Sequence, residues 1–266
     1  MPCVLITGTS SGLGRGVAER LLSLDWEVLG TVRDTTASTD MPFETVALDV
    51  TDEVAVAALG RDVLSRWGRL DALVNNAGHL LNGPVEELRA DELRRQLDVN
   101  VVGAASVTRA MLPALRAARG AVIQVSSVAG QIGYSLMGAY CASKFGLEGL
   151  SESLAQEVRG QGIRVVLVEP SEFRTDISTK GAFVNDRGSS SVYVDQWREQ
   201  DEWNAWMRSD SAPDTRVCVD AIVGAVTRND APMRIAVGEK TAAAVREHAR
   251  DVNAQMDASE AFLRSL

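Results

Sequence analysis

A glycine-rich turn stands between the first apolar segment of the chain and its first helical pattern. Residues 3–7 have the length and composition of a strand, and the helix that follows repeats apolar side chains every four residues. Glycines let a backbone turn tightly and approach a pyrophosphate, which the unpaired N–H groups of a helix N-terminus bind. The spacing is G-x-x-x-G-x-G rather than G-x-G-x-x-G. We expect a dinucleotide phosphate to contact Gly8, Ser10, Ser11, Gly12, Leu13 and Gly14.

Short apolar segments continue to alternate with helical patterns along the 266 residues. Strands separated by helices pair in parallel, and helices then cover both faces of the sheet. The sequence therefore predicts an α/β, doubly wound Rossmann-type fold with about seven parallel strands, in a single domain spanning 1–266. Expected strands are 3–7, 27–32, 44–48, 71–74, 121–125, 163–168 and 234–237.

Charge and composition exclude several classes of partner and site. A net charge of −9 argues against nucleic acid or an anionic membrane as the main partner. No apolar run reaches the ~18 residues of a membrane span, and the N-terminus does not resemble a signal peptide. Three scattered cysteines lack ligand spacing, and there are two histidines. We expect no metal site and a cytoplasmic setting.

The end of the second strand bears on the choice of nicotinamide cofactor. NAD sites usually carry Asp or Glu here to bind the ribose hydroxyl, but this chain has Val32 followed by Arg33. Arginine forms charge-assisted hydrogen bonds with a 2′-phosphate, which favours NADP over NAD. Against this, Arg33 has the alternative of pairing with Asp34 at the surface, and Ser11 adds no second cation.

Polar residues follow two further strands. Asp49 and Val50 end the third strand, where an acceptor suits the adenine amino group, although helix capping explains Asp49 equally well. Residues 75–78 read Asn-Asn-Ala-Gly after the fourth strand, which suits close approach of the backbone to a ligand or a simple turn.

Tyr140 and Lys144 are four residues apart in an expected helix and so lie on one face. A free phenol titrates near ~10, and a neighbouring ammonium favours the phenolate. We therefore expect Lys144 to lower the pKa of Tyr140 toward the range of efficient acid–base catalysis. An amphipathic helix with one core residue and one solvated residue is the alternative.

Two expected helices and one long insertion complete the chain. A helix over 100–118 contains Pro113, which should kink the chain or loosen its pitch. The last helix repeats apolar residues with His248 on its solvated side. Residues 176–212 interrupt the α/β pattern and predict a lid over the substrate; a helical excursion that covers the core is the alternative. Its large aromatic residues are Phe183, Tyr193, Trp197, Trp203 and Trp206.

Taken together, these motifs resemble the short-chain dehydrogenase/reductase family over essentially the whole chain. The T-G-x-x-x-G-x-G motif of that family is similar to residues 7–14, its N-N-A-G to residues 75–78, and its Y-x-x-x-K to residues 140–144. The serine of the family lies thirteen residues before the tyrosine, at Ser127, and its helix asparagine matches Asn100.

The resemblance implies a role for each of four residues. Ser127 would hydrogen-bond the substrate carbonyl, and Tyr140 would exchange a proton with that oxygen. Lys144 would lower the pKa of Tyr140 and bind the nicotinamide ribose, and Asn100 would hold a relay water. The cofactor would supply the hydride. Expected cofactor contacts, besides those in the glycine turn, are Arg33, Asp49, Val50, Asn76, Ala77, Gly78, Tyr140, Lys144, Pro170 and Thr175.

One departure from the family pattern follows the sixth strand. The family usually has Pro-Gly there, whereas this chain has Pro170-Ser171, and a positive φ at Ser171 would cost about 1 kcal/mol. Thr175 still matches the family's carboxamide-binding threonine, and Glu172 is expected to face outward.

The sequence thus predicts an NADP-dependent oxidoreductase acting on a ketone/secondary alcohol pair. Leu80, Leu81 and the aromatic insertion favour an apolar substrate. An NAD-preferring dehydrogenase of the same family and a non-catalytic dinucleotide-binding sensor or scaffold are the alternatives. A serine hydrolase is disfavoured because Ser126 and Ser127 lack a G-x-S-x-G elbow. The resemblance implies a homodimer or homotetramer.

Overall fold

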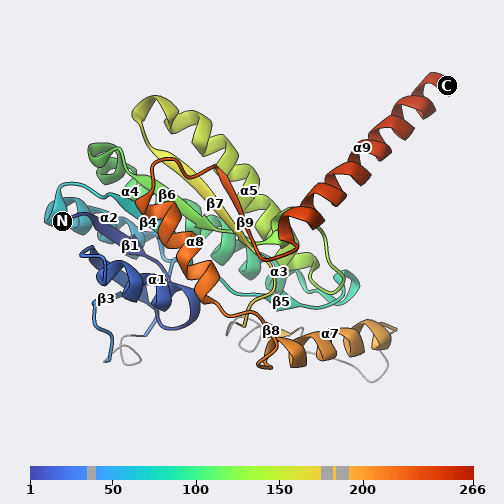
Figure 1. Ribbon diagram of the computed structural model, residues 1–266, viewed down its shortest axis with the longest axis horizontal. Coiled ribbons are helices and arrows are strands. Elements are labelled where there is room, and N and C mark those ends of the chain that lie inside the picture. Colours follow the sequence, from blue (N-terminus) through green and yellow to red (C-terminus); the bar gives the residue numbers. More distant parts are fainter. Residues whose placement is uncertain (35–39, 175–181, 184–191) are drawn as a thin grey trace.

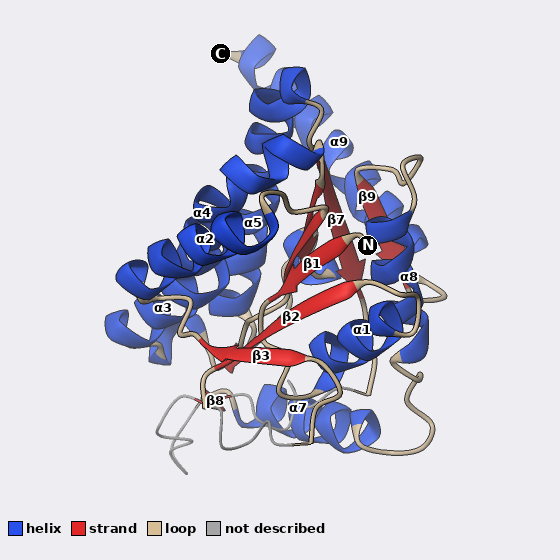
Figure 2. Cartoon of the chain, turned by 90° about the vertical axis from the view of Figure 1, so that its left-hand side faces the viewer, coloured by secondary structure: helices blue, strands red, loops and turns tan. Residues whose placement is uncertain are grey.

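Seven parallel strands form the central sheet of this computed structural model, which describes residues 1–34, 40–174, 182–183 and 192–266 (Figures 1 and 2). The strand order is β3-β2-β1-β4-β6-β7-β9. The strands are β1 (Cys3–Ile6), β2 (Glu27–Val32), β3 (Glu44–Ala47), β4 (Ala72–Asn75), β6 (Ala121–Val125), β7 (Arg164–Pro170) and β9 (Arg234–Val237). The predicted fold class is confirmed, with strand boundaries within two residues of those expected.

The direction of winding reverses beside β1. Strand β1 pairs with β2 on one side, with Leu5 opposite Leu29, and with β4 on the other, with Leu5 opposite Leu73. Because all seven strands are parallel, their carboxyl ends share one edge of the sheet. Ligands of open α/β sheets bind at that edge where the strand order reverses.

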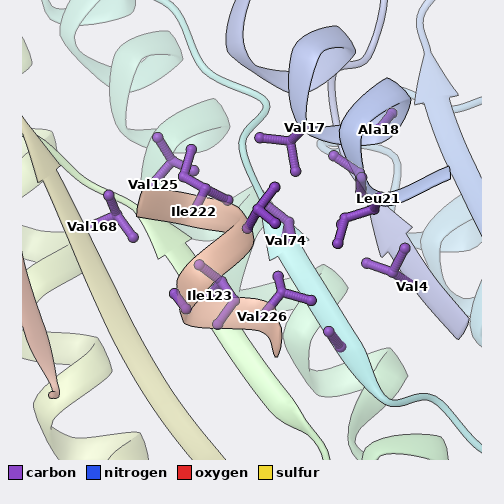
Figure 3. Close-up of a cluster of buried hydrophobic side chains, with 14 of the residues drawn as sticks. Val4, Val17, Ala18, Leu21, Val74, Ile123, Val125, Val168, Ile222 and Val226 are labelled. Atoms are coloured by element: carbon purple, nitrogen blue, oxygen red, sulfur yellow. The ribbon is translucent and has the colours of Figure 1, made fainter. Parts of the chain in front are cut away.

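Helices α1 (Gly12–Leu22) and α8 (Arg216–Thr227) cover one face of the sheet. Alternate strand residues, such as Val4 and Ile6, pack on this face with residues of the two helices. Figure 3 shows Val4, Val17 and Ile222 of this layer. The result is one of two buried apolar layers.

Helices α2 (Glu53–Trp67), α4 (Ala104–Ala118) and α5 (Gly138–Val158) cover the opposite face (Figure 2). Here Leu5 and Leu73 from the strands pack with Met111 and Leu115 from α4. Helix α4 is one uninterrupted element through Pro113, so the proline does not end the helix. Each face of the sheet is therefore closed by a separate hydrophobic layer.

Smaller elements lie at the carboxyl edge of the sheet. Helix α3 (Ala90–Leu97) runs through a π-helical segment (Asp98–Gly103) into α4. Strand β5 (Leu81–Asn82) pairs in parallel with β8 (Ala182–Phe183), which lies in the long insertion. Helix α7 (Val194–Met207) follows in the same insertion (Figure 1). Residues 176–181 and 184–191 lie outside the described residues.

The last helix, α9 (Thr241–Ser265), extends away from the rest of the molecule (Figure 1). Its apolar residues were expected to pack as an amphipathic face, but Val252, Met256 and Phe262 are all exposed. His248 was expected on the solvated side and is half-buried. Of the helices in the described part of the chain, none has the length and apolar character needed to cross a bilayer.

Candidate active site

The glycine-rich turn is fixed by side chains from neighbouring strands. Gly8 has a φ of +73°, and a Cβ there would lie 2.9 Å from the Cα of Ala77. The side-chain amide of Asn76 donates to the carbonyls of Thr7 and Gly8, at 2.9 Å each. The Thr7 hydroxyl in turn accepts from the amides of Asn76 and Ala77, both at 3.0 Å. The two motifs predicted separately, 7–14 and 75–78, therefore form one structure.

The N-terminus of α1 offers a place for an anion. Gly12 has a φ of +60°, and a Cβ on it would meet no described atom within 4 Å, so the space above the turn is open. Ser10 and Gly12 are exposed, and the first turn of α1 has no acidic residue. The first N–H groups of a helix lack intrahelical partners and favour negative charge. These residues fit the pyrophosphate of a dinucleotide.

Arg33 lies at the carboxyl end of β2, exposed, and close to the end of β3. Its charge contributes to the lowered pKa values of both Asp49 and His79, so its guanidinium lies within electrostatic range of each. The main causes of the Asp49 shift are hydrogen bonds from the amide and hydroxyl of Thr51, at 2.9 and 2.7 Å. Asp49 therefore forms a turn with Thr51, while Val50 is buried.

Asn100 sits in the π-helical segment and is buried. Its amide nitrogen donates to the carbonyl of His79 and to the hydroxyl of Ser143, both at 3.0 Å. Its amide oxygen accepts from the N–H of His79 at 3.1 Å. Asn100 thus fixes the backbone just after Gly78 and links it to α5. Single π turns are frequent at functional sites.

Ser127 follows β6 and is buried beside the end of β7. Its hydroxyl donates to the carbonyl of Pro170 at 3.3 Å and accepts from the N–H of Ala129 at 3.1 Å. The same hydroxyl hydrogen-bonds Tyr140, an interaction that acts to lower the pKa of the phenol. Ser127, Tyr140 and Pro170 are therefore brought together although they come from three elements.

Tyr140 differs from expectation in its acidity. The side chain is 6% exposed and packs with Leu80, Ala129 and Cys141. Burial raises the pKa of Tyr140 to about 12, and the hydrogen bond with Ser127 only partly opposes it. The predicted lowering by Lys144 is wrong for this arrangement, because desolvation of the phenolate dominates and the lowering that occurs comes from Ser127. Tyr140 is a neutral phenol at neutral pH.

Lys144 lies one turn further along α5, and its Nζ is 5.6 Å from the centre of the Tyr140 ring. The Nζ donates to the carbonyl of Val125 at 2.8 Å, which ties α5 to the end of β6. Burial lowers the pKa of Lys144 to about 8, and the charge of Glu148 acts in the opposite direction. A buried cation is thus held beside the phenol.

A cluster of buried charged side chains, which the sequence patterns do not predict, lies next to Lys144. Glu148 and Glu169 are both buried, and Arg234 approaches them at 3.1 and 3.2 Å. The Gln131 amide donates to each carboxylate at 3.2 Å. Burial, followed by the charge of Glu148, raises the pKa of Glu169 to about 7. Tyr140, Lys144 and Glu148 recur every four residues, and this spacing could have predicted that Glu148 lies on the same face of α5 as the other two.

The turn after β7 accommodates serine without strain. Ser171 does not have a positive φ, so the anticipated cost is not incurred. The N–H of Ser171 donates to the carbonyl of Val237 at 3.0 Å, and the unusual backbone lies opposite, at Gly238 with a φ of +129°. A side chain on Gly238 would collide with the Ser171 hydroxyl. Thr175 lies outside the described residues.

Helix α7 is attached to the edge of this site at both ends. The Trp203 indole donates to the Glu172 carboxylate at 2.9 Å, and Trp197 is buried against Leu81 and Leu136. Glu172 is exposed, as expected. Within the described ranges, no group of three His, Cys, Asp or Glu side chains is arranged to hold a metal ion.

Comparison with known families agrees with this arrangement. The family model for short chain dehydrogenases matches residues 2–182. The chain is 35% identical over 195 residues to a 3-ketodihydrosphingosine reductase of Bacteroides thetaiotaomicron, covering 73% of this chain and 72% of that one. It is 40% identical over 184 residues to retinol dehydrogenase 5 of Homo sapiens, covering 66% of this chain but only 58% of the relative.

Solved structures give the same result over more of the chain. A short-chain dehydrogenase from Streptomyces avermitilis superposes with a TM-score of 0.86 at 36% identity, covering 99% of this chain and 98% of that one. A metagenomic short-chain oxidoreductase in complex with NADP has a TM-score of 0.60 at 36% identity, covering 65% and 83%. A Burkholderia phymatum short chain dehydrogenase/reductase in complex with NAD has a TM-score of 0.79 at 25% identity, covering 96% and 95%. The chain belongs to the short-chain dehydrogenase/reductase family of oxidoreductases.

Proposed function

We propose that this protein transfers a hydride between NADP(H) and an apolar ketone/secondary alcohol pair. The observation that carries the proposal is the convergence of Ser127, Tyr140 and Lys144 at the carboxyl edge of the sheet, next to the open glycine turn. When bound, the nicotinamide supplies or accepts the hydride.

Each polar side chain has a separate task in this mechanism. The Ser127 hydroxyl donates a hydrogen bond to the substrate oxygen, where negative charge develops during reduction. Tyr140 is protonated at neutral pH because burial raises its pKa, and so it can donate a proton to that oxygen. The buried Lys144 ammonium stabilises the phenolate that remains. Asn100 positions the backbone of His79 beside the site through two hydrogen bonds, and a third joins it to the Ser143 hydroxyl on α5.

The cofactor contacts are assigned from the two linked motifs and from the strand ends. The N-terminus of α1 would bind the pyrophosphate, and Ala77 and Gly78 would contact the ribose side of the cofactor. Arg33 is exposed at the end of β2, where it can bind a 2′-phosphate, and this supports NADP. NAD remains the alternative, since the solved relatives include complexes with each cofactor.

Apolar side chains surround the reacting hydroxyls. Leu80 packs on Tyr140, and Leu81 packs with Leu136 and Trp197 from α7. Such a wall favours a substrate with a hydrocarbon body, in keeping with relatives named for a ketodihydrosphingosine and for retinol. We propose that residues 176–212 act as the lid of a single catalytic domain, and β8 and α7 are its described elements.

Three features of the cellular setting belong to the same proposal. All three cysteines are buried and unpaired, which suits a reducing, cytoplasmic compartment. The net charge of −9 disfavours nucleic acid as a partner. A homodimer or homotetramer is proposed from the family resemblance.

The test is steady-state NADPH consumption with a panel of apolar ketones. We expect Tyr140→Phe to reduce kcat by about 10²–10⁴-fold, the usual contribution of a positioned general acid, while NADPH binding is retained. Tyr134→Phe is the matched control because it removes the same hydroxyl from a tyrosine that is 41% exposed. Undiminished turnover by Tyr140→Phe would disprove the mechanism. Tight NADPH binding with no turnover of any ketone by the native chain would favour the sensor or scaffold alternative.

A further inference from the structure

Helix α9 exposes apolar side chains along most of its length. At about 1.5 Å per residue its 25 residues span roughly 37 Å. Its first turns lie against the body, and every residue from 249 onward is exposed (Figures 1 and 2). Met256 is 55% exposed and Leu263 is 63% exposed. Large apolar side chains in such a position mark an interaction surface.

Seven residues of α9 and of the position just after it follow a heptad repeat, while the exposed Phe262 lies beside the series rather than in it. They recur at alternating intervals of four and three residues, which is the spacing of the a and d positions of a coiled coil. Ser259 is the one polar member of the series. The seam consists of Val245, Ala249, Val252, Met256, Ser259, Leu263 and Leu266. Three heptads lie at the short end of what sustains a coiled coil.

Charges beside this seam distinguish the possible directions of pairing. With Ala249, Met256 and Leu263 as a positions, residues 246, 253 and 260 occupy the e positions. In an antiparallel pair, Met256 packs against the partner's Val252, and Arg246 lies opposite the partner's Glu260. Two-fold symmetry makes this ion pair twice. In a parallel pair, His248 would lie opposite the partner's Asn253, and Gln255 opposite the partner's Glu260. Neither combination joins opposite charges.

We propose that α9 pairs antiparallel with α9 of a second copy of this chain. Glu260 already contacts Arg264 in its own helix at 3.1 Å, and its two carboxylate oxygens allow it to accept from the partner's Arg246 as well. A membrane surface is the less favoured occupant. The helix carries three arginines and four acidic residues, whereas helices that lie on anionic bilayers have a strongly basic polar face.

The first experiment is the molar mass of the full chain by light scattering and sedimentation. Met256→Asp places a charge in the seam and is expected to halve the mass at concentrations where the native chain is associated. Ala254→Asp is the matched control, because residue 254 lies on the opposite side of the helix and should leave the mass unchanged. An unchanged mass with Met256→Asp would overturn the proposal.

Charge exchange tests the direction of pairing. Arg246→Glu and Glu260→Arg each place like charges opposite one another and should weaken association several-fold. The double variant Arg246→Glu/Glu260→Arg restores opposite charges in the antiparallel pair and should recover native association. Failure of the double variant to recover would contradict the antiparallel register.

Cysteine cross-linking and vesicles supply independent readouts. Ala249→Cys/Ser259→Cys should form oxidised dimers efficiently, whereas Ser259→Cys alone should not, because position 259 faces 249 of the partner. Efficient cross-linking of the single variant would indicate parallel pairing and overturn the proposal. The three native cysteines are buried and contribute little background. A vesicle experiment tests the other occupant. If the native chain floats with phosphatidylserine vesicles, and Met256→Asp abolishes flotation without changing the molar mass, the helix binds a membrane surface instead.

Discussion

Replacing Glu169 by glutamine is expected to remove much of the pH dependence of stability on the acidic side of neutrality. The Glu169 side chain is 2% exposed, and burial followed by the charge of Glu148 raises its pKa to about 7 from an ordinary value of 4.5. The folded state therefore binds a proton more tightly than the unfolded state. The stability that this carboxyl contributes is complete below pH 4.5 and is lost as the pH rises through 7.

The size of the effect follows from the two pKa values. At 1.36 kcal/mol for each pKa unit, the difference between 4.5 and about 7 corresponds to about 3 kcal/mol of folding free energy. This is a large part of the 5–15 kcal/mol that stabilises a typical domain. Glutamine has the shape of glutamate and stays neutral at every pH, so Glu169→Gln should not lose this stability as the pH rises.

The measurement is urea unfolding followed by tryptophan fluorescence at about pH 5 and about pH 8. The native chain should lose up to about 3 kcal/mol more than Glu169→Gln between these two conditions. Glu152→Gln is the control, because it removes another carboxylate that contacts Arg234 but is half-exposed. An equal loss in native chain and Glu169→Gln would show that Glu169 is already ionised in the folded protein, and the reasoning would fail.

Other substitutions test the candidate cofactor site and its support. Arg33→Ala should weaken NADPH binding by ~1.5–3 kcal/mol and leave NADH unaffected; equal losses for both cofactors, measured by fluorescence titration, would count against a 2′-phosphate contact. Gly8→Ala should cost at least ~1–2 kcal/mol because φ is +73° and the new methyl would press on Ala77, with a lower Tm and weaker binding of both cofactors. Asn100→Ala removes the acceptor of the His79 N–H and should lower the free energy of unfolding by ~1–3 kcal/mol in a denaturant titration, although the His79 carbonyl keeps its hydrogen bond from Gln96. An unchanged free energy of unfolding would show that this N–H finds another partner.

Local pattern was sufficient to predict the sheet and the placing of the motifs. The strands 27–32, 121–125 and 234–237 were predicted with their observed boundaries, because each is a short, mainly apolar segment bounded by polar turns. The residues that follow the strands gather at one edge of the sheet because all seven strands are parallel. Thr7 and Asn76 bond directly, a contact that topology imposes on residues far apart in sequence.

Properties that depend on tertiary surroundings could not be predicted in this way. The pKa of Tyr140 was expected to fall because Lys144 is nearby in sequence, but the burial that raises it comes from residues of other elements. The sequence around Glu169 does not predict its contact with Arg234 or its proximity to Glu148. The three residues come from separate segments that meet only in the folded chain. The exposure of α9 could not be predicted either, because a heptad pattern does not show whether other elements pack against the helix.

The π-helical segment has a consequence for the length of the chain. A π turn contains one residue more than an α turn, so the segment Asp98–Gly103 behaves as a local insertion between α3 and α4. Rewinding the same six residues as regular α-helix would rotate α3 by about 100° relative to the buried face of α4. Asn100 would then no longer face the His79 backbone. Homologues that shorten or lengthen the chain are therefore expected to do so in the surface loops, leaving this segment at constant length.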